Sequence, residues 1–125
     1  MSAQKTVLLV DDDTDIIESM RTVLEGRGYR VMVARSGPEA VTIYADKRKE
    51  IELVVTDSDM PFMDGHATSI ALKKINPGLK IIMASGSVQK GPVAQASGNI
   101  SAFVPKPYTV DKLLTTVHEV LAQKA

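Results

Sequence analysis

The sequence predicts an α/β fold in which one parallel sheet of five strands is covered by helices on both faces. Short runs of apolar, β-branched residues recur along the chain, and stretches with the spacing of amphipathic helices separate them. The runs VLLV, LVV and IIM are almost continuously apolar, as in strands that are buried on both faces. Alternating strands and helices favour parallel pairing, because each parallel pair needs a long crossover connection.

The apolar runs place the five strands at residues 6–10, 30–34, 53–56, 80–83 and 103–105. A helix follows the first strand and is closed by Gly26 and Gly28. Its apolar residues with helical spacing are Ile16, Ile17, Met20, Val23 and Leu24. A second helix is expected to start at Ser36, which can cap it, while Glu39 can return a hydrogen bond to the capping residue.

Three further helices complete the expected pattern. The turn Met63-Asp64-Gly65 precedes the third helix, and Gly65 is expected to adopt a positive φ there. The fourth lies in residues 86–101, where glycines and a proline predict a short or mobile helix. The last has a long apolar stripe that fits a helix lying on a sheet, formed by Val110, Leu113, Leu114, Val117, Val120 and Leu121.

Length and composition exclude several classes of protein. The 125 residues suit one domain, which we expect to span 1–125, and the formal net charge of +0 provides no overall attraction for nucleic acid or an anionic membrane. The absence of cysteine excludes disulfides and thiolate metal sites. No secretion signal or membrane span is apparent, so a cytoplasmic location is expected.

Polar residues follow separate predicted strands and are expected to meet at one edge of the sheet. In chain order they are Asp11 and Asp12 after the first strand, Asp57 at the end of the third, Ser85 after the fourth and Lys106 after the fifth. Ligands of doubly wound sheets bind at the carboxyl ends of the strands. Four separate loops therefore deliver acids, a hydroxyl and an ammonium group to one place.

These residue types suit the transfer of a phosphoryl group. Crowded carboxylates favour a hard divalent cation, and Mg²⁺ suits one or two carboxylates together with a phosphate oxygen and waters. The metal and Lys106 would neutralise charge on the phosphoryl group, and Ser85 would donate to one of its oxygens. Asp57 would then act as the nucleophile and form an acyl phosphate.

The sequence resembles the receiver domains of two-component response regulators along its whole length. The resemblance rests on LLVDDD at 8–13, DSDMPFMDG at 57–65, IIMASG at 81–86 and FVPKPY at 103–108. It implies a single doubly wound, flavodoxin-like domain with strand order 2-1-3-4-5 and five helices. It also implies a signalling domain rather than a conventional enzyme, although the domain catalyses its own phosphorylation and dephosphorylation.

The resemblance assigns a role to each site residue. Asp57 is the phosphoacceptor, Asp12 and Asp57 bind Mg²⁺ directly, Asp11 acts largely through water, and Asp59 adds its backbone carbonyl. After phosphorylation, Ser85 moves toward the phosphoryl group and Phe103 rotates inward, which alters the output surface. The implied partner is a histidine kinase or histidine phosphotransfer protein, with an unidentified downstream protein target. We expect no nucleic-acid or membrane partner, and a monomer or weak dimer.

Other interpretations of the same residues remain open at this point. Asp57-Ser58-Asp59 after an apolar strand also matches the nucleophile and general acid of a haloacid-dehalogenase-like phosphatase. That class expects the motif on the first strand, and here a complete β-α-β-α pattern precedes it. A pseudo-receiver that only binds partners is a third possibility. The residues Asp11, Asp12 and Asp13 could also do no more than cap the first helix.

Overall fold

The chain forms a parallel sheet flanked by helices, in a computed structural model that describes residues 4–60, 63–85, 100–105 and 109–122. The elements, in chain order, are β1 (Thr6–Val10), α1 (Thr14–Gly26), β2 (Arg30–Ala34), α2 (Gly37–Lys47), β3 (Ile51–Asp57), α3 (Gly65–Ile75), β4 (Lys80–Ser85), β5 (Ala102–Pro105) and α5 (Val110–Ala122). The predicted fourth helix falls almost entirely outside the described residues. Within these ranges, no helix combines the length and apolar character that a membrane span requires.

The sheet confirms the predicted topology. Its strand order is β2-β1-β3-β4-β5, and every neighbouring pair is parallel. The order reverses between β1 and β3, because the chain builds outward from β1 to β2 and then returns to the other side of β1. Ligands of doubly wound sheets bind at such a point, beyond the carboxyl ends of the strands.

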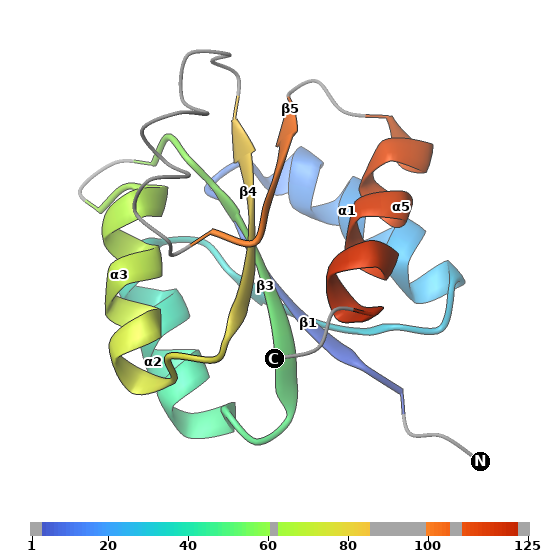
Figure 1. Cartoon of the computed structure of the whole chain (residues 1–125). Helices are drawn as coiled ribbons and strands as arrows, with labels where there is room; N and C mark the ends of the chain where they lie inside the picture. The colour runs from blue at the N-terminus through green and yellow to red at the C-terminus, as the bar shows by residue number, and fades with distance from the viewer. Residues whose placement is uncertain (1–3, 61–62, 86–99, 106–108, 123–125) are drawn as a thin grey trace.

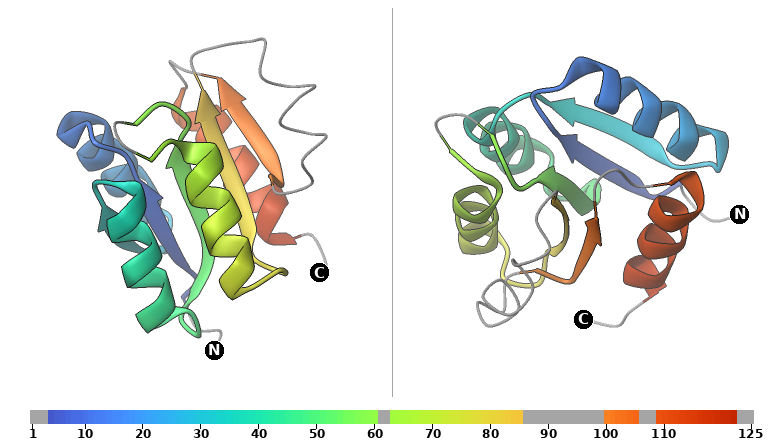
Figure 2. Two further views of the ribbon diagram at one scale, coloured as in Figure 1. Left: turned by 90° about the vertical axis from the view of Figure 1, so that its left-hand side faces the viewer. Right: turned by 90° about the horizontal axis from the view of Figure 1, so that it is seen from above.

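Two apolar layers hold the helices to the sheet. Figure 1 and the view from above in Figure 2 show α1 and α5 on one face and α2 and α3 on the other. Side chains of β1 alternate between the layers: Val7 and Leu9 pack toward α1 and α5, and Leu8 and Val10 pack toward α2 and α3. All five residues of β1 are buried, as the continuous apolar run predicted.

Two strands continue past the predicted ends of their apolar runs. β3 extends from Ile51 to Asp57, and β4 extends to Ser85. The additional residues are held by pairing between strands, because Asp57 pairs with Ala84 and Ser85 pairs with Pro105. Backbone pairing continues past the point where the side chains stop being apolar, and this brings Asp57 and Ser85 to the edge of the sheet within regular strands.

The helix caps were predicted in part. Ser36 caps α2 by accepting from the backbone N–H of Glu39 at 3.2 Å. The Glu39 carboxylate accepts from the N–H of Arg35 at 2.7 Å. It was expected to return its bond to the capping residue itself, and the observed bond goes one residue earlier. Gly28, which follows α1, has a φ of 92°, the conformation that favours glycine after a helix.

The prediction of a positive φ at Gly65 was wrong, although the turn before α3 was correct. Among the described glycines, only Gly28 has a positive φ. Gly65 is instead required by close packing: a Cβ atom built on it would overlap the carbonyl oxygen of Asp57 and lie 2.8 Å from Cα of Ser58. Its N–H donates to the carbonyl of Ser58 at 3.0 Å. The first residue of α3 therefore presses directly on the end of β3.

Candidate functional site

Three carboxylates meet at the carboxyl edge of the sheet. One carboxylate oxygen from each of Asp11, Asp12 and Asp57 lies within 4.8 Å of the other two. Asp11 and Asp12 follow β1, and Asp57 ends β3, so adjacent parallel strands bring them together. The predicted convergence of these three acids is confirmed.

Backbone contacts fix the position of Asp11. Its N–H donates to the carbonyl of Ala34 at 3.1 Å, which continues the β1–β2 ladder one residue past the strand. Its carboxylate accepts from the N–H of Asp13 at 2.9 Å. Asp11 is 1% exposed, whereas Asp12 is exposed to solvent. A bound ion would thus meet one carboxylate from inside the protein and one from its surface.

Asp57 sits at the end of a buried strand and is itself 6% exposed. Its Oδ1 accepts from the N–H of Asp59 at 3.3 Å. The next residue, Ser58, donates its N–H to the carbonyl of Ala84 at 2.9 Å and so remains in register with β4. Gly65, the first residue of α3, packs closely against the backbone of Asp57 and Ser58. These contacts leave the main chain at Asp57 little freedom to shift relative to Asp11.

Asp13 has the structural role that was considered for all three N-terminal acids. It caps α1, and its carboxylate accepts from the N–H of Asp15 at 2.9 Å and of Ile16 at 3.2 Å. Because Asp13 occupies the capping position, helix capping does not account for Asp11 and Asp12. Those two acids belong to the cluster with Asp57.

The Asp59 carboxylate is outside this cluster. It is exposed, and its Oδ2 accepts from the Ser58 hydroxyl at 3.3 Å. A phosphatase of the haloacid-dehalogenase type would use Asp59 as a general acid beside Asp57. The acids that gather around Asp57 are instead Asp11 and Asp12, which lie earlier in the chain. Metal binding by the Asp59 backbone carbonyl stays a prediction.

The remaining predicted site residues are described only in part. The backbone of Ser85 ends β4 beside Pro105 of β5, at the same edge as Asp57. Phe103 lies on β5 opposite Met83 and is partly buried. Lys106 falls outside the described residues, so its predicted contact with the phosphoryl group remains a prediction.

The donor set fits Mg²⁺. All three groups offer carboxylate oxygens, which are hard ligands, and one or two of them together with phosphate oxygens and waters make a common Mg²⁺ site. Three negative charges at this separation repel one another, and a divalent cation would offset that repulsion. This is a property of the residues present and does not depend on any resemblance.

Two contacts near the site had no counterpart in the sequence predictions. Gly65 contacts the backbone of Asp57 and Ser58, and Arg35 donates from its guanidinium to the hydroxyl of Thr14. Neither a motif spacing nor a periodic pattern in the sequence reveals these contacts, because each depends on how two different elements pack together in space. The expected cap at Ser36 marked the start of α2 beside Arg35, but it did not indicate that the Arg35 side chain contacts Thr14.

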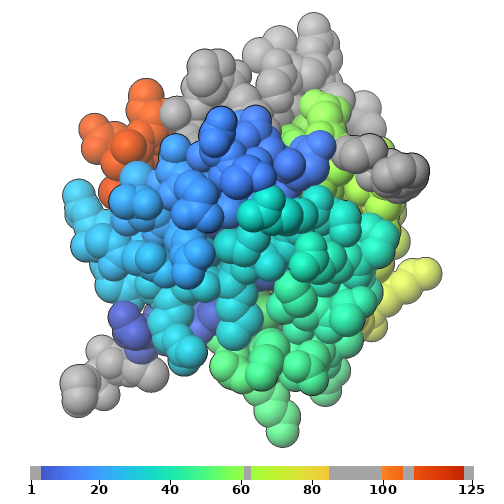
Figure 3. All heavy atoms as spheres, turned by 180° about the vertical axis from the view of Figure 1, so that it is seen from behind, coloured from blue at the N-terminus to red at the C-terminus, as the bar shows by residue number. Residues whose placement is uncertain are grey.

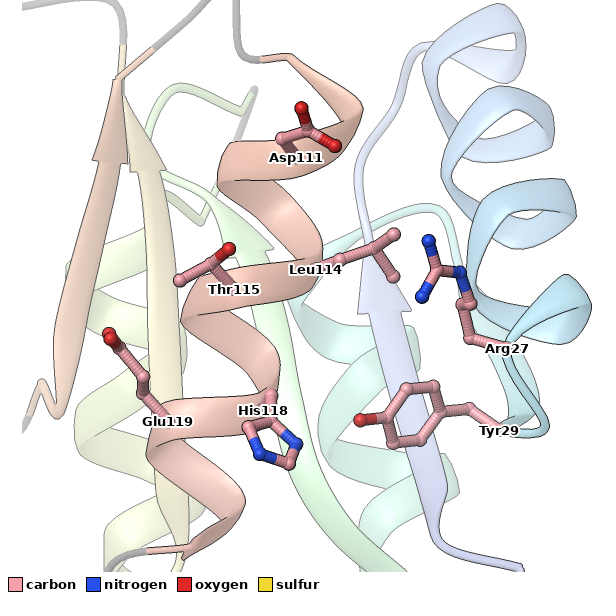
Figure 4. A pocket seen from close by; sticks show the side chains of 7 residues that line it. All are labelled: Arg27, Tyr29, Asp111, Leu114, Thr115, His118 and Glu119. Carbon is pink, nitrogen blue, oxygen red and sulfur yellow. The ribbon is translucent and has the colours of Figure 1, made fainter.

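A separate hollow of about 480 Å³ lies between α5 and the end of α1. Figure 4 shows Arg27 and Tyr29 on one side and Asp111, His118 and Glu119 on α5. None of the acids in the cluster lines it. Its walls carry charges of both signs, and no group in it indicates one kind of ligand.

Comparisons with known proteins agree with the fold. The family model described as "Response regulator receiver domain" matches residues 7–118. The chain is 35% identical over 125 residues to "Sensor kinase CckA" of Brucella abortus (strain 2308), covering 99% of this chain and 13% of the kinase. It is 32% identical over 121 residues to "Transcriptional regulatory protein GlrR" of Escherichia coli (strain K12), covering 95% of this chain and 27% of that protein.

A solved structure of similar fold contains a metal ion and a second protein. The "CheX-CheY-BeF3-Mg+2 complex" from Borrelia burgdorferi matches with a TM-score of 0.88 and 27% identity, covering 95% of this chain and 90% of that chain. The curated relatives CckA and GlrR are much longer than this chain, which spans 13% and 27% of them. These matches do not favour the phosphatase or the pseudo-receiver alternative.

Proposed function

Because the chain belongs to the response regulator receiver family, the phosphoacceptor modules of two-component signalling, we propose that Asp57 is the residue that receives the phosphoryl group. The donor is a phosphohistidine on a histidine kinase or a histidine phosphotransfer protein. The reaction requires Mg²⁺, and the domain supplies much of the catalysis itself. Phosphorylation then changes a surface that a downstream protein recognises.

One observation carries this proposal. The carboxylates of Asp11, Asp12 and Asp57 lie within 4.8 Å of one another at the carboxyl edge of the sheet. Asp57 is the member of the set that ends a buried strand and has its backbone held on both sides. A nucleophile of this kind needs a fixed position relative to the cation, and these contacts provide it.

In the proposed step, a carboxylate oxygen of Asp57 attacks phosphorus and forms a new P–O bond. The bond between phosphorus and the partner's imidazole nitrogen breaks, and its electron pair stays on that nitrogen, which then takes up a proton. When bound, Mg²⁺ neutralises negative charge on the phosphoryl oxygens. Asp12 and Asp57 would hold the ion directly, Asp11 would act largely through water, and the Asp59 carbonyl would complete the set.

The other predicted residues complete the switch. We propose that Lys106 neutralises a phosphoryl oxygen and that the Ser85 hydroxyl donates to another. Movement of Ser85 toward the phosphoryl group would vacate space that Phe103 then fills. Support comes from the strand pairing, because Ser85 and Pro105 are neighbours at the edge where Asp57 lies.

The proposal has further parts that concern the whole protein. Residues 1–125 form one receiver domain, located in the cytoplasm, that acts as a monomer or weak dimer. It hydrolyses its own acyl phosphate to reset the switch. Its phosphodonor and its target are proteins, and the formal net charge of +0 supports the expectation that nucleic acid is not a partner.

The test is phosphorylation by a small phosphodonor. The protein is incubated with acetyl phosphate with and without Mg²⁺, and the adduct is followed by intact mass. We expect a labile adduct that requires Mg²⁺ and disappears in Asp57→Asn. Asp13→Asn is the matched control, because this nearby acid caps α1 and is outside the cluster.

Two results would overturn the proposal. An adduct that persists in Asp57→Asn would place the phosphoryl group elsewhere. Repeated turnover of general phosphate esters, without a stoichiometric adduct, would instead indicate a phosphatase. If the Asp13→Asn control also formed no adduct, the cause would be a folding defect, which circular dichroism would identify.

A further inference from the structure

We propose that Arg35 is a positioning residue for the acidic loop at residues 11–13, and that it acts through Thr14 to raise the affinity of the site for Mg²⁺. This inference rests on the function proposed above, because it concerns the same metal site. Arg35 belongs neither to the sequence motifs described above nor to the cluster of Asp11, Asp12 and Asp57.

Arg35 links two helices that lie on opposite faces of the sheet. It is the first residue after β2, at the carboxyl edge. Its Nη1 donates to Oγ1 of Thr14 at 2.5 Å, and its backbone N–H donates to Oε1 of Glu39 at 2.7 Å. Figure 3 shows the two helices adjoining on this side of the molecule, with α1 in blue and α2 in teal. One residue therefore joins the first turn of α1 to the first turn of α2.

The acidic loop is fastened to the end of β2 at both of its ends. The N–H of Asp11 donates to the carbonyl of Ala34, and Thr14, just beyond the loop, accepts from Arg35. Asp12 lies between these two attachments. Its side chain is exposed, so the packing that orients Asp11 does not orient it to the same degree.

Holding both ends of the loop limits the positions that the Asp12 carboxylate can sample. A metal ligand that is already ordered loses less conformational entropy when the ion binds. Outer residues that orient metal ligands commonly change metal affinity by about 10- to 100-fold when removed. Arg35 contacts Thr14 rather than a metal ligand, and the contact is exposed. We therefore expect its removal to weaken Mg²⁺ binding less, by about three- to tenfold.

The charge of Arg35 acts in the opposite direction, which makes the inference testable. A guanidinium group at the rim of a cation site repels Mg²⁺, so a purely electrostatic role predicts tighter binding when Arg35 is replaced by a neutral residue. A positioning role predicts weaker binding. Thr14→Val separates the two effects, because it removes the hydrogen-bond acceptor and leaves the arginine charge in place.

The experiment is an Mg²⁺ titration followed by amide chemical shifts in NMR spectra. It compares the unaltered protein with Arg35→Met, Thr14→Val and the double variant. We expect each single variant to bind Mg²⁺ about three- to tenfold more weakly, and the double variant to be no weaker than the weaker single one. Arg21→Met is the control, because Arg21 lies on α1, the helix that begins at Thr14, and pairs with Glu25. The Arg21→Met variant should bind Mg²⁺ as tightly as the unaltered protein does.

The possible outcomes distinguish the two proposals. Tighter binding in Arg35→Met with no change in Thr14→Val would show a charge effect and overturn the inference. Unchanged affinity in both, or additive losses in the double variant, would also overturn it. If the unaltered protein binds no Mg²⁺, the proposed function fails as well. Thermal unfolding of each variant separates a loss of stability from a loss of affinity, since a purely structural contact would change only the former.

Discussion

Replacing Gly65 by alanine is expected to destabilise the protein, although alanine usually favours helices. A Cβ atom at this position would lie 2.8 Å from Cα of Ser58 and 3.2 Å from the carbonyl carbon of Asp57, and would overlap the Asp57 carbonyl oxygen. Unstrained carbon atoms approach to about 3.5 Å. The end of β3 and the start of α3 would therefore have to separate by roughly 0.7 Å, the difference between that contact distance and the 2.8 Å approach.

The size of the effect follows from what resists that separation. The N–H of Ser58 donates a hydrogen bond to the carbonyl of Ala84 in β4 at 2.9 Å. The N–H of Gly65 donates one to the carbonyl of Ser58 at 3.0 Å. Both overlapping groups are backbone, so no side chain can rotate away. Overpacking costs about 1–3 kcal/mol, and the helix preference of alanine returns less than about 1 kcal/mol at a helix start. We expect a net loss of about 1–2 kcal/mol in the free energy of unfolding.

Urea denaturation measures this loss, with a midpoint expected to fall by about 1 M for a protein of this size. Gly26→Ala is the matched control. Gly26 ends α1, and a Cβ atom there meets nothing within 4 Å, so its stability should be unchanged or slightly higher. Gly65→Ala should also weaken Mg²⁺ binding, because it displaces the backbone of Asp57. A Gly65→Ala protein as stable as Gly26→Ala would refute the close approach.

Two further substitutions test the charges of the site. Asp12→Asn removes one of three carboxylates whose oxygens lie within 4.8 Å of one another. In urea with EDTA, the free energy of unfolding should rise by about 1 kcal/mol because this repulsion is relieved. Added Mg²⁺ should stabilise the variant less than it stabilises the unaltered protein. A loss of stability in EDTA would contradict the repulsion. Asp59→Asn removes an exposed carboxylate beside Asp57 and should weaken Mg²⁺ binding about twofold and alter the lifetime of the acyl phosphate. Unchanged affinity and lifetime would show that Asp59 tunes neither.

The topology could be predicted because its signals are local and repeated. The runs around Leu8, Val54 and Ile82 are apolar on both faces, which is typical of central strands in a parallel sheet covered on both sides. Parallel strands place their carboxyl ends at one edge, so the position of Asp57 after its strand was enough to predict its approach to Asp11. The ends of β3 and β4 were predicted too early, because pairing with neighbouring strands extends each beyond its apolar residues.

The contacts that were not predicted depend on how separate elements and loops are placed relative to one another in space. Gly65 appears in the sequence as an ordinary turn glycine, and its actual constraint comes from the Asp57 carbonyl, which belongs to another element. The hydrogen bond that the Arg35 N–H donates to Glu39 differs by one residue from the expected capping pattern, in which the N–H of Ser36 would donate. Only the path of the chain after β2 decides between the two donors. The bond from Arg35 to Thr14 has no local signal at all.

The central place of β1 in the sheet also determines when the site can form. β1 is made first during synthesis, yet its two neighbours are β2 and β3, and β3 ends at Asp57. A nascent chain that stops short of β3 already contains Asp11 and Asp12 but has one flank of β1 unpaired and no third carboxylate. Asp57 and the two acids that follow β1 therefore come together in the same event that completes the middle of the sheet. A folding intermediate without β3 should gain no stability from Mg²⁺.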